Sequence, residues 1–226
     1  GASGVGLWQP EVGAWRHVVG ADAARGGGVA DDRVVVFGGG TLAAWERATD
    51  PRSHRVSAGA GLAAIAWSPD GALVAFGGGA GQLLVLDVRG GELRRAAVTG
   101  EVVKSLAFAP AARALAAGVA TERGLRILDS DTLAERGDAA RDPALRVRRL
   151  AILGGDRVLG FGYGTTVRGV ALRDGAPIAV APVTEPVIDA ALPIATDAVY
   201  ALGVRGAVWR YDGAGQRRLR DAAGAA

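Results

Sequence analysis

The chain has 226 residues and no Cys, and its 26 Lys and Arg residues against 23 Asp and Glu residues leave a formal net charge of +3. This charge is too small for a dedicated nucleic-acid binder, and the lack of Cys excludes disulfides, thiolate metal sites and a cysteine nucleophile. The length suffices for one domain or one array of repeats. No apolar stretch approaches the roughly 18 to 20 residues of a membrane span, so we expect no membrane partner.

Taken in chain order, the sequence contains six similar apolar runs, each followed by a turn. The runs are spaced 37, 41, 42, 43 and 40 positions apart when they are aligned on Trp8, Trp45, Leu86, Leu128, Ala171 and Tyr211. A regular period in this range indicates a repeat architecture in which each copy is one supersecondary unit.

The clearest copy covers residues 62–98. Its first apolar run, at 62–67, is followed by the turn Ser68-Pro69-Asp70-Gly71, in which Pro sets φ at the second position and Gly accepts a positive φ. Three more short runs follow, separated by Gly-rich turns. The copy therefore predicts four short strands joined by hairpins. The runs are too short, and Gly is too frequent, for helices.

The same pattern extends along the chain. We expect half a copy at 5–19 and full copies at about 22–58, 62–98, 102–137, 145–181 and 187–220. One four-stranded sheet cannot bury both of its faces alone, so the copies must stack around a common axis. The sequence therefore predicts an all-β fold: a β-propeller of four-stranded antiparallel blades, with about five and a half blades in this chain.

Two copies resemble the WD-repeat family. In one, Ala64-Ile65-Ala66-Trp67-Ser68-Pro69-Asp70-Gly71-Ala72-Leu73-Val74-Ala75 precedes Leu83 to Asp87, and in the other Ser105 to Pro110 precedes Arg126 to Asp129. The resemblance implies a non-catalytic propeller that binds other proteins through its loops.

The polar positions of the WD-repeat pattern are largely absent. That family commonly places a His before the innermost strand and an Asp in the turn before the third strand, where they join a buried polar network. Ala58 and Thr99 stand at the His position here, and Ala80 stands at the Asp position. We therefore expect blades that are held together by apolar packing more than by polar contacts.

The predicted strands do not make up a whole number of blades, because residues 5–19 supply only the last two strands of a blade. A propeller closes by pairing its first and last strands, since an open ring leaves unpaired edges. Either the missing strands lie upstream in a longer polypeptide, or another chain supplies them, or five blades close and the N-terminal hairpin packs elsewhere. We favour the first alternative, which the missing initiator Met supports, and expect a fragment of a six- or seven-bladed protein.

Sequence features that could indicate phosphate binding, metal binding or catalysis have simpler explanations here. The glycines of residues 77–81 could suggest a phosphate loop, but such a loop needs Gly directly before Lys-Ser, and Lys104-Ser105 follows Val103. His17 and His54 lie on expected outer strands without metal-ligand spacing, and no Gly-x-Ser-x-Gly elbow occurs. We expect no enzyme, no cofactor and no metal.

A five-bladed carbohydrate-active or lactone-cleaving enzyme is the alternative from a different class. It would need two or more carboxylates, or a bound metal, at the central channel. The expected innermost strands carry only Asp189, and most other acids fall in turns.

Cations on the innermost strands are the remaining distinctive feature. Lys104 lies in one blade, Arg146, Arg148 and Arg149 in the next, and Asp189 in the blade after. They could form a positive mouth of the central channel that receives an acidic peptide or a phosphate. They could also pair between blades, for instance Arg149 with Asp189, and we favour this second interpretation.

We therefore expect a scaffold or sensor module that presents loops to a protein partner or to a neighbouring domain of the same polypeptide. The five charged residues named above are the candidate partner-binding residues. Phosphate or nucleic-acid binding through the arginines is a further alternative, and it would weaken steeply with salt. The Arg-, Ala- and Gly-rich composition is typical of a GC-rich bacterial genome, and we expect a cytoplasmic location.

Overall fold

The structure of the chain is a computed structural model. It describes the backbone of six segments within the first 60 residues, at 5–9, 14–18, 24–30, 33–38, 41–45 and 53–57, and then residues 61–97, 102–109, 113–119, 124–136, 146–191 and 197–220. Within these ranges, side chains are described from residue 61 onward, except those of residues 80, 96, 97 and 220.

The described residues form antiparallel sheets of consecutive strands. The first is the hairpin β1 (Val5–Gln9) and β2 (Ala14–Val18), and the second holds β3 (Ala24–Ala30), β4 (Arg33–Gly38), β5 (Thr41–Trp45) and β6 (Ser53–Ser57). The third holds β7 (Leu62–Trp67), β8 (Leu73–Gly78), β9 (Gln82–Asp87) and β10 (Leu93–Ala97), with the short 3-10 helix η1 (Gly79–Gly81) before β9. The fourth holds β11 (Val103–Ala109), β12 (Ala114–Val119) and β13 (Leu125–Asp129).

The last two sheets have four strands each. The fifth holds β14 (Val147–Leu153), β15 (Arg157–Gly162), β16 (Val167–Ala171) and β17 (Pro177–Ile178). The sixth holds β18 (Val187–Ala191), β19 (Val199–Gly203), β20 (Val208–Asp212) and β21 (Gly215–Arg220). No described segment is a helix with the length and hydrophobicity that crossing a membrane requires.

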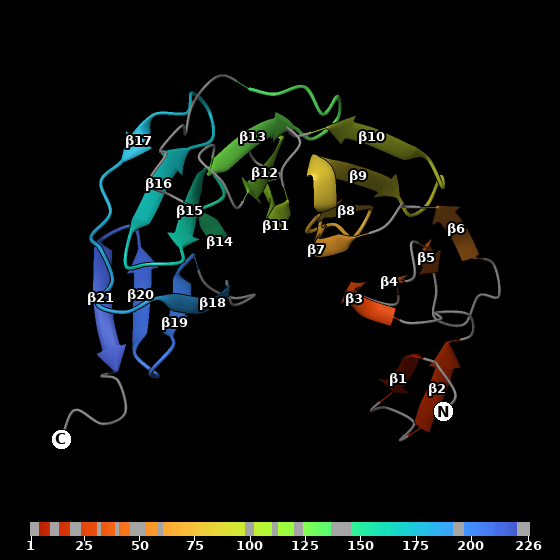
Figure 1. The fold of residues 1–226 in the computed structure, drawn as a ribbon, viewed down its shortest axis with the longest axis horizontal. Coiled ribbons are helices and arrows are strands. Elements are labelled where there is room, and N and C mark those ends of the chain that lie inside the picture. Colours follow the sequence, from red (N-terminus) through yellow and green to blue (C-terminus); the bar gives the residue numbers. More distant parts are fainter. Residues whose placement is uncertain are drawn as a thin grey trace.

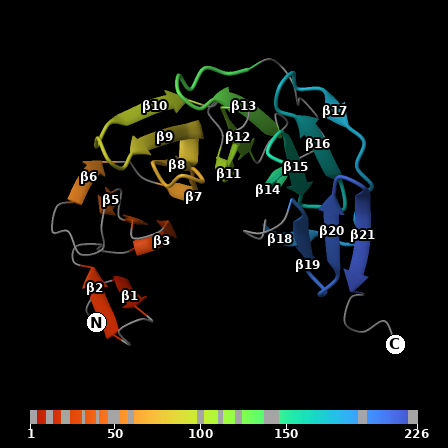
Figure 2. The ribbon, with the colours of Figure 1, turned by 180° about the vertical axis from the view of Figure 1, so that it is seen from behind.

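The sheets are arranged like vanes around a shared centre (Figure 1). The first strand of each four-stranded sheet lies nearest the centre, and the last lies outermost. The view from behind shows the same arc, with the β1–β2 hairpin at one end and the β18–β21 sheet at the other (Figure 2). This arrangement confirms the predicted β-propeller, with five blades and half of another in this chain.

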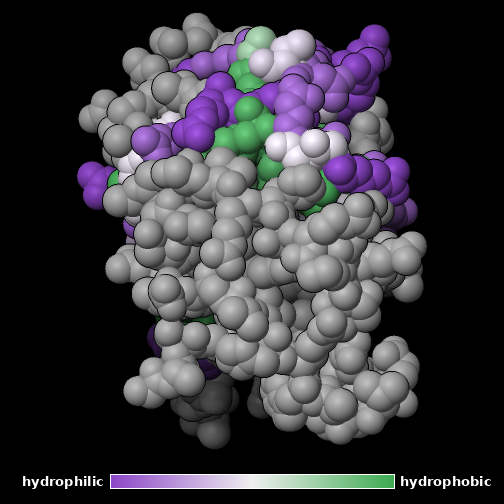
Figure 3. Space-filling model, turned by 90° about the vertical axis from the view of Figure 1, so that its right-hand side faces the viewer, coloured by the Kyte–Doolittle hydropathy of each residue, from purple (hydrophilic) through white to green (hydrophobic). Residues whose placement is uncertain are grey.

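The core lies between neighbouring sheets. One face of the third sheet, including Ala75 and Val85, joins a cluster with Leu115 and Leu128 of the fourth sheet, and similar clusters join the fourth sheet to the fifth and the fifth to the sixth. Because side chains alternate along a strand, the neighbouring Val74 faces the other way, and it is also completely buried. Figure 3 shows hydrophilic and hydrophobic described residues side by side in the upper part of this view.

Each innermost strand carries a β-bulge at the same place. The register between the first two strands of each four-stranded sheet shifts around one residue near the start of the first strand, and the fourth sheet shows the same shift. The bulged residues are Arg25, Ala63, Lys104, Arg148 and Ile188. Since a bulge removes one residue from the ladder and redirects its side chain, these five positions are structurally equivalent.

The fourth sheet differs from the sequence prediction, which placed a strand near 133–137. There the chain forms an isolated bridge between Leu128 and Glu135, flanked by backbone hydrogen bonds of 2.8 Å from Asp129 to Ala134 and from Arg136 to Ile127. Residue 137 lies outside the described residues, so the pairing is described only up to Arg136.

The sixth sheet is covered on one face only within the described residues. Ala201 is buried against the fifth sheet, whereas Leu202 is 40% exposed and Tyr200 is partly exposed. Counted from the bulge, Leu202 is equivalent to Phe161 and Tyr200 to Leu159 in the fifth sheet, where both side chains are buried. The face that meets the next blade elsewhere is therefore open here.

The third sheet meets the fourth, and the fourth meets the fifth, so closely that one position of the second strand requires Gly in the third and fourth sheets. A Cβ placed on Gly118 of β12 would lie 2.5 Å from Cγ1 of Val147, the first residue of β14. Gly77 holds the equivalent position in β8, where a Cβ would lie 2.6 Å from the Cβ of Val103. Both valines are completely buried, so they cannot move aside without disturbing the core.

We expect Gly118→Ala to lower the free energy of unfolding by about 1 to 3 kcal/mol, because the added methyl group overpacks against Val147. Combining it with Val147→Ala should cost less than the sum of the two single changes, since the clashing atoms are gone. The control is Gly213→Ala, whose Cβ would meet no atom within 4 Å. Urea unfolding of the four variants measures these differences. Equal destabilisation by the two glycine substitutions would contradict the packing argument.

Candidate functional site

The five charged residues predicted from the sequence lie on three neighbouring innermost strands. Lys104 and Arg148 are the bulged residues of β11 and β14, and Arg146 directly precedes β14. Arg149 and Asp189 are the residues that follow the bulges of β14 and β18. The bulges thus place Lys104 and Arg148 at one equivalent position of their blades and Arg149 and Asp189 at the next, at the end of the channel where the innermost strands begin.

The pairing between blades that the sequence suggested is present. Arg149 donates from Nε to Oδ1 of Asp189 over 3.3 Å, and this ion pair joins β14 to β18. At the same register one blade earlier, the backbone N–H of Leu150 donates to Oγ of Ser105 over 3.0 Å. Because both charged side chains are substantially exposed, the pair aligns the strands more than it stabilises them.

The other three cations form no ion pair with another residue in the described ranges. Arg146 is exposed, and Lys104 and Arg148 are half-buried. The guanidinium carbon of Arg148 lies 5.8 Å from the ring centroid of Tyr163, which is a cation–π contact. Three positive charges therefore gather at the start of two adjacent innermost strands, with one aromatic ring beside them.

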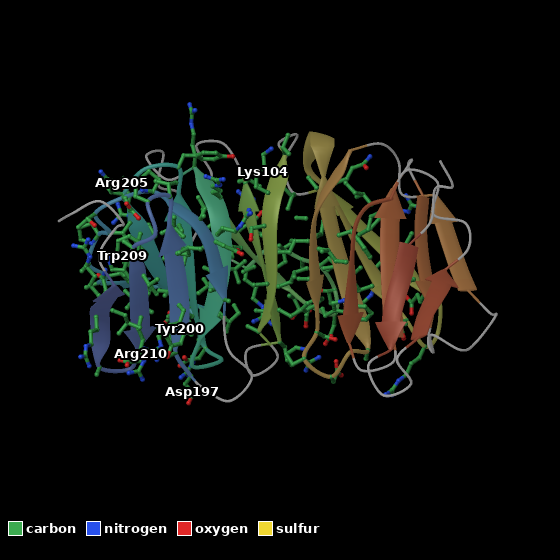
Figure 4. All side chains as sticks on the ribbon, turned by 90° about the horizontal axis from the view of Figure 1, so that it is seen from below. Lys104, Asp197, Tyr200, Arg205, Trp209 and Arg210 are labelled. Carbon is green, nitrogen blue, oxygen red and sulfur yellow. The ribbon has the colours of Figure 1, made fainter. Side chains whose placement is uncertain are left out.

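A buried carboxylate lies at the same end of the ring. Glu185, in the loop before β18, is 1% exposed. Its Oε1 accepts hydrogen bonds from the backbone N–H groups of Arg205 (3.1 Å) and Ala207 (3.0 Å), and its Oε2 accepts one from Nε of Arg205 (2.8 Å). Figure 4 shows Arg205 at the same edge of the ring as Lys104, opposite Asp197. The carboxylate thus fastens the β19–β20 turn to the loop that leads into the innermost strand.

Glu185 is a polar contact in a blade for which the sequence predicted mainly apolar packing. It stands two residues before the innermost strand β18, and it binds the turn before the third strand, where the WD-repeat pattern has its Asp. Gly203 leaves room for it, since a Cβ there would lie 2.6 Å from the Glu185 carboxyl carbon. The one signal in the sequence was an acid between Thr184 and Pro186, directly before an apolar strand.

The protonation of Glu185 follows from its surroundings. Burial by itself would raise the pKa of the carboxyl group, because it disfavours the charged form. The hydrogen bonds from the Arg205 side chain and from the Ala207 and Arg205 backbone outweigh this effect and hold the pKa below its ordinary value. The group is therefore a carboxylate at neutral pH and not a general acid.

Acidic residues at the ends of the hairpins accept hydrogen bonds from the turns that follow them. Asp87 Oδ1 accepts from the backbone N–H of Arg89 and Gly90, at 2.8 and 3.0 Å. A hydrogen bond from Arg136 at 2.7 Å is the main reason that the pKa of Asp129 lies well below its ordinary value.

Of the innermost strands described here, only β18 carries an acid, and the described residues hold no group of three His, Asp or Glu side chains that could bind a metal.

The glycines of residues 77–81 lie at the end of β8 and in the turn that follows it. They cover the end of β8 and the 3-10 helix η1, and β9 begins directly after them. A phosphate-binding loop of the P-loop type opens onto a helix N-terminus instead. These glycines therefore have the hairpin role that the sequence indicated.

Comparison with known proteins supports the fold. A scan against protein-family models and a search of curated proteins return no match. Among solved structures, the chain is similar to the WD40 domain of Pan2 from Neurospora crassa, with a TM-score of 0.66 and 17% identity over 86% of this chain and 64% of that chain. The chain thus has a WD40-like β-propeller fold, and it spans slightly less than two thirds of the length of that domain.

We expect Glu185→Gln to lower the urea midpoint at pH 7, because the neutral amide binds Arg205 and the turn more weakly. Since the folded pKa is below the ordinary value of about 4.5, the carboxylate stabilises the fold above that pH. This contribution is lost as the pH falls through the lower folded pKa. The control is Glu92→Gln, at an exposed position, which should leave the midpoint unchanged. A deficit of Glu185→Gln that persists undiminished at pH 2 would contradict the assignment.

Proposed function

We propose that this chain is a non-catalytic interaction module and that it binds an acidic segment of a protein partner, or of a neighbouring domain, at the channel end formed by β11 and β14. The observation that carries the proposal is the group of three cations, Lys104, Arg146 and Arg148, which have no acidic partner among the described residues. Cations that no described acid neutralises are available to a negatively charged ligand.

The scaffold under these cations supports this proposal. Val103 and Val147, the first residues of their strands, are completely buried between the blades, so the backbone that carries the cations is held rigidly. A rigid frame positions side chains for binding at little cost in conformational entropy. Arg149 is already paired with Asp189, and we therefore assign it to alignment of the blades.

A protein segment fits the site better than a nucleic acid does. Single-stranded nucleic acids are usually held by several aromatic side chains that stack on successive bases. Tyr163 is the one aromatic residue at the described cation group, and it is already in contact with Arg148. Carboxylates of a peptide need only positive donors, and Arg pairs with them in bidentate geometry.

A fluorescein-labelled peptide of ten Glu residues is the probe. We expect combined substitution of Lys104→Ala, Arg146→Ala and Arg148→Ala to weaken its binding by at least about tenfold at low salt. The matched control removes three exposed cations elsewhere, through Arg89→Ala, Arg173→Ala and Arg217→Ala, so its net charge is the same. Fluorescence anisotropy gives both affinities.

Equal weakening by the two triple variants would show that only net charge matters and would refute the site. Competition with inorganic phosphate and with a single-stranded oligonucleotide distinguishes the ligands. If the oligonucleotide binds more tightly than the acidic peptide, the alternative of nucleic-acid binding replaces this proposal.

We also infer that strands outside this chain cover the open face of the sixth sheet, as the sequence-based expectation of a larger ring requires. Leu202 at 40% exposure, where the equivalent Phe161 is buried, supports this inference. The intact mass of the protein from its natural source tests it. A mass larger than that of this chain, or a co-purifying chain rich in β-strands, is expected, and a lone product of this size would refute it.

A further inference from the structure

A cavity of about 410 Å³ lies between the fifth and sixth sheets, away from the cation group. The β20–β21 hairpin lines one side of it, and the segment that follows β17 lines another. It lies at the outer part of the two sheets, since β17 and β21 are their outermost strands (Figure 1). A volume of this size is within the range of sites that hold small ligands or peptide side chains.

The floor of the cavity is apolar and rigid. Leu153 and Leu159 are 5% and 2% exposed and belong to the core between the two sheets. Ile178 and Val180 line the cavity and pack over Gly169, where a Cβ would lie 2.6 Å from Cγ2 of Val180. An apolar group that enters would therefore meet a preformed surface.

Two residues that line this cavity each carry a buried polar atom without a partner among the described residues. The atoms are the hydroxyl of Tyr211 and Oε1 of Gln216. Tyr211 is 2% exposed, and its ring is held edge-on against Phe161 at a centroid distance of 5.6 Å. Leaving a buried polar atom unpaired is costly, so such atoms in a folded protein call for a partner. Two of them at one cavity point to a ligand that supplies hydrogen bonds.

The charged side chains that line the cavity already form ion pairs within the protein. Asp212 pairs with Arg210 at 3.1 Å and accepts from the backbone N–H of Ala214 at 2.9 Å. Arg157 pairs with Asp156 at 3.4 Å. What the cavity offers is therefore a hydroxyl group, a carboxamide oxygen and aliphatic side chains, a combination that suits an uncharged ligand with an apolar group and an N–H donor.

The edge beside the cavity suits an extended peptide. The outer strand β17 has only two residues, where β10 has five and β21 has six. The chain continues through Ala179 and Ala181, which are exposed and line the cavity. These residues form no ladder with another described strand, so their backbone groups are available to an added strand.

We propose that this cavity binds a short, uncharged, extended peptide of a partner protein. The peptide lies along residues 178–181, inserts an aliphatic or aromatic side chain over Leu153 and Leu159, and donates an amide N–H to Gln216. The site is separate from the cation group, and neither depends on the other.

The probes are acetylated and amidated peptides of the form Gly-Ser-X-Ser-Gly, with X as Leu, Phe, Ala or Asp. Titration to about 5 mM, followed by NMR on the full chain, is sensitive enough for weak binding. We expect saturable shifts of the Gln216 signals with Leu or Phe, and weaker or no shifts with Ala or Asp. Gln216→Ala should weaken binding of the Leu peptide by roughly five- to tenfold, as one lost hydrogen bond implies.

Two further variants separate binding from folding. Ala181→Trp, at an exposed position on the cavity rim, should block the Leu peptide, whereas Arg217→Ala, on β21 but not on the cavity, should leave its affinity unchanged. Gln216→Ala should not lower the melting temperature, because it removes an unpaired buried atom. If no peptide shifts the Gln216 signals, or if Ala181→Trp leaves those shifts intact, the cavity holds only water and the proposal fails.

Discussion

Apolar packing between neighbouring sheets is the interaction on which the rest of this structure depends. Burial contributes about 25 cal/mol for each Å² of apolar surface, and a single four-stranded sheet can bury neither face by itself. Val74 and Ala75, adjacent on β8, are both completely buried because each faces a different neighbouring sheet. The close fit at Gly118 and Val147 follows from the same constraint. Each blade is therefore stable only beside another blade.

Polar contacts between blades come second to this packing, and some of them lie where the innermost strands begin. The Arg149–Asp189 pair and the hydrogen bond from Leu150 to Ser105 fix the register of neighbouring innermost strands. Within the sixth blade, Glu185 holds one loop against one turn. These contacts differ from blade to blade, as expected if they orient elements whose cohesion comes from the apolar clusters. This explains how the fold persists where most polar positions of the WD-repeat pattern are missing.

The two proposed sites lie at different parts of the propeller, one on the innermost strands and one beside the outermost strands. The cations lie on innermost strands, where a bulge in each blade redirects one side chain toward the channel end, and binding there would depend on charge and salt. The cavity beside Tyr211 lies where an outer strand is cut short, and binding there would depend on shape and hydrogen bonds. A propeller can hold both sites because its rigid core leaves the strand ends and the edges free to vary.

The sequence by itself determined the period, the strands and the propeller, because hydrophobic alternation, turn residues and repeat length are local properties. It also singled out Lys104, Arg146, Arg148, Arg149 and Asp189 and suggested the one ion pair that forms among them. Only the tertiary structure decided that Lys104 and Arg148 share a bulge position, that Glu185 holds a distant turn, and that Tyr211 and Gln216 line one cavity with Leu153 and Leu159 of the next sheet. These facts depend on strand register and on contacts between residues 20 or more positions apart, such as Glu185 and Arg205, and no local sequence pattern records them.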